Sequence, residues 1–548
     1  MSNDIYDYIV VGGGAAGAIL ADRLSESGQH SVCLLEAGPS DWHPFLHIPA
    51  GFIKVLFNPA FTWTYSSEPT EWTQGRRIPL PQGRTLGGST SINGLVYNRG
   101  QREDFDGWAE KGNPGWSYDE VLPYFKRNER YAGGEDHYRG RDGRLPVSDL
   151  EWIHPLCERF MAGAQGLGMP RNPDYNGRTQ AGVGYFQRSI EGRWRMSTAR
   201  TYLGQARRRP NLHIITHAQA TAVLFDGRRA AGVRYLKGGQ GGETRQVSAR
   251  REVVLSCGAI NTPKLLQLSG VGPADLLQSL GLPVVHALSG VGANLSDHFS
   301  VRLVARVKGI STINELSRAP RLWSQIGAWL AGRPNLLAVS PSLVHWFWQS
   351  SQDLDRPDLQ GVFAPASYRE GYVGMLDQYP GMTCGVWQHR PHSRGTVTLR
   401  SRDVFADPLI QPNYLADERD RRVLLGGLRL ARQLLATPEL APLVDAETLP
   451  GPGVQSDDEW LNFAKRYGVS SYHLNGSARM GPVGDRNAVV DPELKVHGLN
   501  GLRVVDASVM PAIVSANTCA ATMMIAEKAA DLILERTPLS AEIDKERA

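Results

Sequence analysis

Residues 8–17 have the sequence Tyr-Ile-Val-Val-Gly-Gly-Gly-Ala-Ala-Gly, a short apolar run that leads directly into a cluster of glycines. The apolar run suits a buried parallel strand, and the glycines have GxGxxG spacing. Gly12 makes the tight turn, Gly14 lets the backbone approach a pyrophosphate, and Gly17 permits close packing of the following helix. The stretch therefore predicts the strand, turn and helix of a dinucleotide-binding site.

A second strand and an acidic residue complete this pattern. Residues 18–24 supply the apolar stripe of a helix, Gly28 can end it, and the apolar residues 32–35 predict a strand that delivers Glu36. Glu36 lies about 20 residues after the last glycine, where a carboxylate accepts hydrogen bonds from ribose hydroxyls and repels a 2′-phosphate. NADP is therefore disfavoured, whereas FAD and NAD both remain compatible with the motif.

Length and composition indicate a soluble protein with more than one packed region. The 548 residues are too many for one simple core, so we expect two or more regions, interleaved or consecutive. Hydrophobic residues make up 41% and charged residues 21%, and no apolar run is long enough to cross a bilayer. The N-terminus lacks a basic stretch followed by an apolar one, so we expect no signal peptide and a cytoplasmic location.

Charge and cysteine usage argue against nucleic-acid binding and against a disulfide or zinc framework. The net charge is only +4, and the run Arg207-Arg208-Arg209 precedes Pro210 as in a loop, so we expect no nucleic-acid partner. The five cysteines form no CxxC pair, which argues against a disulfide framework and a zinc site. The histidines of residues 389–392 flank a proline and have no adjacent carboxylate, so we interpret them as a loop and predict no metal.

Two longer segments narrow the choice of cofactor. Residues 83–94 read GRTLGGSTSING, and residues 258–272 read GAINTPKLLQLSGVG. Gly87-Gly88-Ser89 offers backbone donors and little bulk, which suits close approach to a flat ring or a phosphate. An ordinary glycine loop would have the same composition, so the residues alone leave both interpretations open.

Together with the N-terminal glycines, these segments resemble the two signature stretches of the glucose-methanol-choline (GMC) oxidoreductases, a family that uses FAD. The resemblance continues in residues 472–481, YHLNGSARMG, and residues 505–511, VDASVMP. It covers essentially the whole chain and is weakest between about residues 301 and 383. In some relatives a histidine of the first signature is joined covalently to the flavin, but Ile92 stands here, which implies non-covalent FAD.

The resemblance implies an α/β fold in which a Rossmann-like FAD-binding domain is interleaved with an α+β substrate-binding domain. The FAD-binding domain would comprise residues 1–155, 205–300 and 476–548, and the substrate-binding domain residues 156–204 and 301–475. The residue pattern agrees with this layout. It predicts strands at residues 253–256 and 501–506, and a hairpin at residues 223–228 that turns at Asp-Gly.

The resemblance also implies which residues contact FAD. They come from the glycine turn, the first signature, one strand of the middle section and the C-terminal part. The predicted contacts are Gly12, Gly14, Ala15, Ala16, Gly17, Glu36, Ala37, Arg84, Leu86, Gly88, Ser89, Asn93, Gly94, Leu95, Ala220, Asp506, Ala507, Asn517 and Thr518.

His473 and Asn517 are the predicted catalytic residues. Removing a hydride from a neutral alcohol requires a base for the hydroxyl proton, and an imidazole titrates near neutrality. Most of the 14 histidines are expected to be structural or exposed, but His473 lies in the family motif. Asn517, which aligns with the second member of the family's active-site pair, can donate a hydrogen bond to the substrate oxygen. Turn formation is the alternative role for Asn517.

Aromatic residues of the least recognisable region are candidates for substrate contacts. Trp346 and Trp387 can form the apolar wall of a pocket, and Tyr472 precedes the predicted base. A plain core role fits the tryptophans equally well.

The predicted activity is FAD-dependent oxidation of an alcohol, of a primary aliphatic or aromatic type, to the aldehyde or ketone by hydride transfer to flavin N5. The partners would be the alcohol and an electron acceptor, either oxygen or another acceptor. The alternatives are a flavin-containing hydroxynitrile lyase, other chemistry on the same fold such as light-driven decarboxylation, and non-enzymatic FAD binding. Retention of His473 counts against decarboxylation, and the sequence does not indicate an oligomeric state.

Overall fold

The glycine turn connects strand β1 (Asp4–Val11) to helix α1 (Ala15–Ser25) in the computed structural model, which describes residues 4–369 and 375–543. Gly12 has φ +102°, a conformation that favours glycine. A Cβ atom on Gly17 would lie 1.8 Å from the carbonyl oxygen of Gly12, so the helix can pack here only with glycine. The predicted strand, turn and helix are confirmed.

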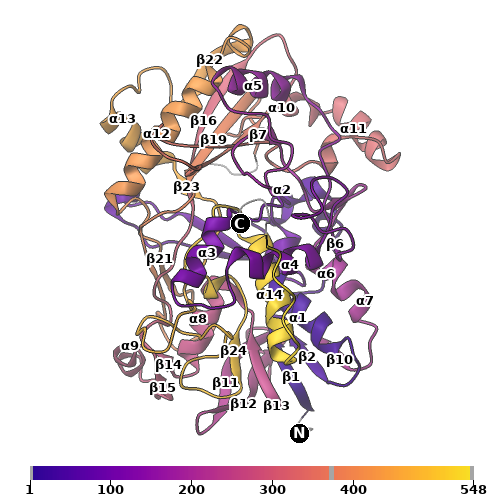
Figure 1. Cartoon of the computed structure of the whole chain (residues 1–548), viewed down its shortest axis with the longest axis vertical. Coiled ribbons are helices and arrows are strands. Elements are labelled where there is room, and N and C mark those ends of the chain that lie inside the picture. Colours follow the sequence, from indigo (N-terminus) through magenta and orange to yellow (C-terminus); the bar gives the residue numbers. More distant parts are fainter. Residues whose placement is uncertain (1–3, 370–374, 544–548) are drawn as a thin grey trace.

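The first large sheet carries this turn and lies at one end of the molecule (Figure 1). Its parallel strands, in spatial order, are β10 (Leu212–Ile215), β2 (Val32–Leu35), β1, β13 (Glu243–Leu255) and β24 (Leu502–Val504). The antiparallel hairpin of β11 (Ala218–Asp226) and β12 (Arg229–Lys237) extends the sheet beyond β13, with the predicted turn at Asp226-Gly227. The two late strands and the hairpin predicted from the sequence are therefore present.

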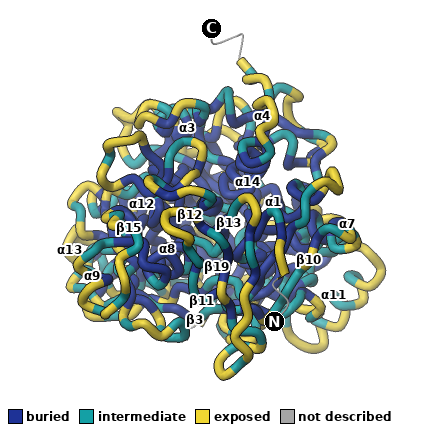
Figure 2. Tube along the Cα trace, turned by 90° about the horizontal axis from the view of Figure 1, so that it is seen from below, coloured by how far each residue is buried: buried dark blue, intermediate teal, exposed yellow. Residues whose placement is uncertain are grey.

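Helix α14 (Cys519–Ile533) forms the centre of the packing beside this sheet. It lies against α1 and against α4 (Tyr118–Asn128), and most of its residues are buried (Figure 2). The C-terminal part of the chain is thereby fixed beside the glycine turn, although the two are far apart in sequence.

The second large sheet is antiparallel and lies at the other end of the molecule (Figure 1). Its strands, in spatial order, are β22 (Val444–Leu449), β16 (Phe299–Val307), β19 (Gly381–Gln388), β18 (Leu359–Ala364), β17 (Val344–Trp348) and β7 (Gly182–Tyr185). Strand β23 (Val469–Ser470) pairs with the start of β16. Val301 and Leu303 of β16 enter the core that includes α12 (Glu418–Leu435), whereas Ser300 and Arg302 face a cavity, as the two-residue period of a strand requires.

Shorter elements connect and cover the two sheets. The remaining helices are α2 (Phe52–Val55), α3 (Arg102–Glu110), α5 (Pro155–Gly166), α6 (Thr198–Thr201), α7 (Leu203–Ala206), α8 (Gly258–Leu268), α9 (Ala274–Ser279), α10 (Ile313–Leu316), α11 (Arg321–Leu330) and α13 (Asp457–Tyr467). The remaining strands are β3 (Thr62–Ser66), β4 (Pro79–Gly83), β5 (Glu129–Arg130), β6 (Leu145–Pro146), β8 (Ile190–Glu191), β9 (Trp194–Arg195), β14 (Val271–Gly272), β15 (His286–Ala287), β20 (Thr396–Thr398) and β21 (Leu409–Gln411).

The α/β fold with two differently built sheets agrees with the predicted fold class. The strands of the first sheet come from the segments expected for the FAD-binding domain, and β16 of the second sheet begins at Phe299, just before the expected boundary. The exact domain boundaries stay a prediction. Among residues 4–369 and 375–543, no helix combines the length and apolar character that crossing a bilayer requires.

Candidate active site

One continuous cavity connects the glycine turn of the first sheet with the second sheet. Gly12, Glu36 and Ala220 line it at one end, and His473 and Asn517 line it near the second sheet. The sequence motifs that are far apart in the chain therefore meet around a single space.

The end of the cavity at the glycine turn fits the nucleotide part of FAD. Glu36 accepts hydrogen bonds from the backbone N–H groups of Gly13 and Gly38, both at 2.8 Å, and its remaining lone pairs can accept from ribose hydroxyls. Burial raises the pKa of Glu36 to about 7, although these two hydrogen bonds act in the opposite direction. Gly14 has no side chain to cap helix α1, so the first-turn amides are open to a pyrophosphate.

Most of the predicted FAD contacts line this cavity. They are Gly12, Gly14, Ala15, Ala16, Glu36, Ala37, Gly88, Ser89, Asn93, Gly94, Leu95, Ala220, Asp506, Ala507, Asn517 and Thr518.

Three predicted contacts lie behind the lining. Gly17 packs under the turn, against Gly12. The guanidinium of Arg84 lies 4.9 Å from the ring centroid of Trp63, and Leu86 is buried against the first sheet. These residues support the cavity wall rather than form its surface.

Asp506 joins two segments beside the cavity. Its carboxylate accepts hydrogen bonds from the backbone N–H groups of Gly258 at 2.9 Å and Ser508 at 2.8 Å, and from the Thr262 hydroxyl at 2.6 Å. Because these contacts occupy its oxygens, Asp506 holds the start of helix α8 beside the C-terminal strand.

The backbone that carries His473 is fixed by the buried carboxylate of Asp297. One oxygen of Asp297 accepts from the N–H groups of His298 at 2.9 Å and His473 at 2.8 Å, and the other accepts from the hydroxyls of Tyr414 and Ser470. Burial raises the pKa of Asp297 to about 6, against the effect of these four hydrogen bonds.

The hydrogen bonds of His298 determine which nitrogen of His473 carries a proton. Nε2 of His298 lies 2.7 Å from the carbonyl oxygen of His389, which can only accept, so this nitrogen is protonated. Burial lowers the pKa of His298 to about 4, so the ring is neutral at pH 7 and its Nδ1 is an acceptor. Nδ1 of His473 lies 2.9 Å from that acceptor and therefore donates. In neutral His473, Nε2 then carries no proton, and its lone pair can accept.

Asn517 and Gln360 continue this chain of hydrogen bonds on the other side of His473. Nδ2 of Asn517 lies 3.0 Å from Nε2 of His473 and donates to it. The side-chain oxygen of Asn517 accepts from Nε2 of Gln360 at 3.2 Å, which holds the amide in this orientation. The site thus presents an unprotonated imidazole nitrogen and an amide donor side by side.

His473 is poised to accept a proton rather than to donate one. Burial, and next the nearby ring of His298, hold its pKa well below the usual value for histidine. The side chain is therefore neutral at neutral pH, the form that a general base requires.

Two of the three predicted substrate residues line the cavity. The ring centroid of Trp387 lies 6.0 Å from that of His473, and Tyr472 precedes His473 with φ +65°. Trp346 does not reach the cavity. It pairs with Gly361 across β17 and β18, and its ring occupies the space above this glycine in the core of the second sheet.

Sequence reasoning missed His298, Gln360 and Arg302. Each comes from the second sheet or its edge, in a region without a recognised motif. The sequence signal that points to Arg302 is the alternation of Ser300 and Arg302 with the apolar Val301 and Leu303, because this pattern marks a strand with one polar face. In the part of the chain that the structure describes, no group of three or more His, Cys, Asp or Glu side chains could hold a metal ion.

The fold and this site together define a flavoprotein oxidoreductase. Residues 6–300 match the N-terminal part of the GMC oxidoreductases, and residues 391–526 match the C-terminal part. The chain belongs to the GMC oxidoreductase family and is an FAD-dependent oxidoreductase that acts on CH–OH donors.

Relatives and solved structures agree with this family. An alcohol dehydrogenase [acceptor] of Pseudomonas putida is 39% identical over 98% of this chain and 97% of its own length. An oxygen-dependent choline dehydrogenase of Vibrio vulnificus is also 39% identical, over 97% of this chain and 95% of its own length. Pyridoxine 4-oxidase from Mesorbium loti has 28% identity and a TM-score of 0.87, covering 97% of this chain and 99% of that structure. A variant of Aspergillus oryzae formate oxidase has 26% identity and a TM-score of 0.90, covering 98% of this chain and 99% of that structure.

Proposed function

We propose that the protein oxidises an alcohol to an aldehyde or ketone, with His473 as the base and FAD as the hydride acceptor. The observation that carries this proposal is the unprotonated Nε2 of His473, which lies 3.0 Å from the amide nitrogen of Asn517 inside the cavity.

In this mechanism the substrate hydroxyl lies between His473 and Asn517. Nε2 of His473 takes the hydroxyl proton, and the Asn517 amide donates to the oxygen as negative charge develops there. The C–H bond then breaks with its electron pair, and the carbonyl forms. Bound FAD supplies the acceptor for that hydride.

The hydrogen bond between His298 and His473 survives the proton transfer. Because Nδ1 of His298 accepts from Nδ1 of His473, this contact persists when the ring of His473 becomes cationic. Asp297 keeps both backbones in place during the step.

FAD is bound non-covalently in this proposal. Ile92 lines the cavity where a histidine would be needed for the covalent link, and its side chain has no nucleophilic atom. Acid precipitation of the holoprotein should therefore release the yellow chromophore into the supernatant. Colour retained in the pellet would contradict non-covalent binding.

The experiment that tests the function is anaerobic mixing of the FAD-loaded protein with a panel of alcohols. Bleaching of the oxidised flavin absorbance supports alcohol oxidation. Absence of bleaching, together with cleavage of a hydroxynitrile, would overturn it in favour of a lyase. Comparison of peroxide formation with dye reduction then distinguishes oxygen from another electron acceptor.

A further inference from the structure

Arg302 places a positive charge in the cavity close to the catalytic residues. It lies on β16 two residues after Ser300, and both line the cavity. The same strand is preceded by His298, whose ring contacts His473. Four residues of strand span about 13 Å, so Arg302 lies further along the same face of the sheet.

The neighbouring strand leaves room for the side chain of Arg302. Arg302 pairs with Gly385 across β16 and β19. A Cβ atom on Gly385 would lie 3.0 Å from Cγ2 of Val362 and 3.5 Å from Cγ of Arg302. The stem of Arg302 therefore crosses over the glycine on the cavity face of the sheet.

The guanidinium of Arg302 has no partner among the described residues: no hydrogen bond or ion pair joins it to any of them. Arg306, on the same strand, instead pairs with Asp445 at 2.6 Å. The carboxylates that line the cavity, Glu36 and Asp506, belong to the cofactor end and already accept backbone N–H groups. Among the residues that the structure describes, a half-buried cation thus faces the cavity without an anion.

The groups around Arg302 are mainly hydrogen-bond donors. Tyr368 and Tyr472 line the same cavity, and burial raises the pKa of both phenols while the charge of Arg302 acts against that rise. The indole N–H of Trp387 is buried without a partner, and the residue is 5% exposed. A carboxylate accepts hydrogen bonds only, so it matches this set of donors.

We propose that Arg302 binds the carboxylate of the substrate, so that the protein oxidises alcohols that also carry an acid group. This inference rests on the proposed function. Because Arg302 lies along the strand from the catalytic histidines, the hydroxyl and the carboxylate would stand at opposite ends of the substrate, separated by a spacer such as a phenyl ring. A substrate with a quaternary ammonium group would bring a second cation beside Arg302 and bind poorly.

The experiment compares three alcohols: 4-(hydroxymethyl)benzoate, its neutral amide 4-(hydroxymethyl)benzamide, and choline. With the FAD-loaded protein, KM for the acid should be about ten- to a hundredfold lower than for the amide, as expected for a charge-assisted hydrogen bond. Choline should be the poorest of the three. Arg302→Leu should remove the difference between acid and amide through KM, with kcat nearly unchanged, and Arg302→Lys should restore part of it.

Calorimetric titration with 4-methylbenzoate, which has no hydroxyl to oxidise, tests binding without turnover. The unsubstituted protein should bind it, Arg302→Leu should weaken binding by the same factor, and the matched control Arg306→Leu should not. Equal KM for acid and amide, or unchanged 4-methylbenzoate binding in Arg302→Leu, would overturn the role of Arg302 and leave alcohol oxidation standing. Failure of every alcohol to bleach the flavin would instead overturn the proposed function.

Discussion

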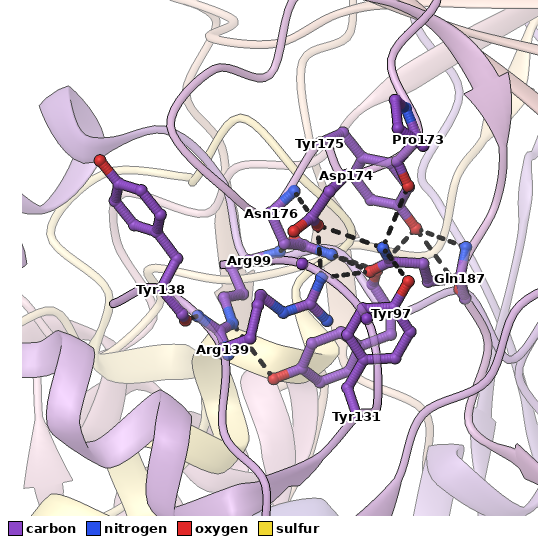
Figure 3. Close-up of polar contacts among 12 residues, drawn as sticks. Tyr97, Arg99, Tyr131, Tyr138, Arg139, Pro173, Asp174, Tyr175, Asn176 and Gln187 are labelled. Carbon is purple, nitrogen blue, oxygen red and sulfur yellow. Dashed lines mark hydrogen bonds and ion pairs between the residues drawn. The ribbon is translucent and has the colours of Figure 1, made fainter. Parts of the chain in front are cut away.

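Two buried polar networks of this protein differ in the charge of their groups and in whether they reach the active-site cavity. In the first, Glu129 lies between Arg99 and Arg139. Arg139 also contacts Asp174 and Gln187 (Figure 3). Two arginines thus face two carboxylates, and their charges cancel. Tyrosine and amide side chains surround them.

In the second network, neutral side chains reach the active-site cavity. Hydrogen bonds run from the carbonyl of His389 through His298 to His473, whose unprotonated Nε2 accepts from Asn517. The comparison teaches that burial of polar groups alone does not mark a functional site. An unprotonated acceptor with a shifted pKa beside a cavity marks it, whereas an ion-pair network away from that cavity indicates a structural role.

The largest expected effect comes from removing the side chain of His473, the proposed base. His473→Ala should slow flavin reduction by alcohol by about 10²- to 10⁴-fold, because proton removal loses its acceptor. Anaerobic stopped-flow absorbance measures this rate, and the flavin-to-protein ratio should stay unchanged. The control His137→Ala, at a partly exposed position, should reduce at the normal rate. A normal rate in His473→Ala would refute the assignment of the base.

The next effect tests the ion-pair network around Glu129. Glu129→Gln leaves two buried guanidinium groups without their shared carboxylate, so the free energy of unfolding should fall by about 3–5 kcal/mol. Chemical denaturation measures this change. Flavin reduction in the fraction that remains folded should be unaltered. The matched control Glu243→Gln, in an exposed pair with Arg245, should leave stability unchanged. Loss of catalysis without loss of stability in Glu129→Gln would break the distinction between the networks.

A smaller effect on the free energy of unfolding is expected when the pH is lowered. Burial lowers the pKa of His298 to about 4 and of His345 to about 3, below the ordinary value of 6.5 that they regain on unfolding. The unfolded chain therefore binds protons first as the pH falls below 6.5. Each such histidine should cost about 1.4 kcal/mol of stability per pH unit until its folded pKa is reached. The buried carboxyls of Glu36 and Asp297, whose pKa values are raised to about 7 and about 6, act in the opposite direction because the folded chain binds their protons first. The contribution of one histidine is therefore the difference between the denaturation curves of the unsubstituted protein and of His345→Phe from pH 7.5 to 5. An equal pH dependence of the two proteins would mean that His345 keeps its ordinary pKa when folded.

Local patterns were sufficient to predict the glycine turn and several strands of the first sheet, whereas most of the candidate site residues came from the resemblance to the family. Residues 8–17 and the Asp226-Gly227 turn are continuous in sequence, so their structure follows from neighbouring residues. His298, Gln360 and Arg302 are brought together by the pairing of distant strands, and a local pattern reveals at most the polar face of one strand. Trp346 was expected at the substrate because of its type, but the alternation of β17 turns its side chain toward Gly361 and the core.

The most direct test of the mechanism is the protonation state of the His473 ring, observed by NMR of holoprotein with ¹⁵N-labelled histidine side chains. The His473→Gln variant identifies the signals. At neutral pH we expect a neutral ring with the proton on Nδ1 and none on Nε2, and His298→Phe should disturb this preference because it removes the acceptor. A ring protonated on Nε2, or on both nitrogens, at neutral pH would contradict the role of His473 as the base.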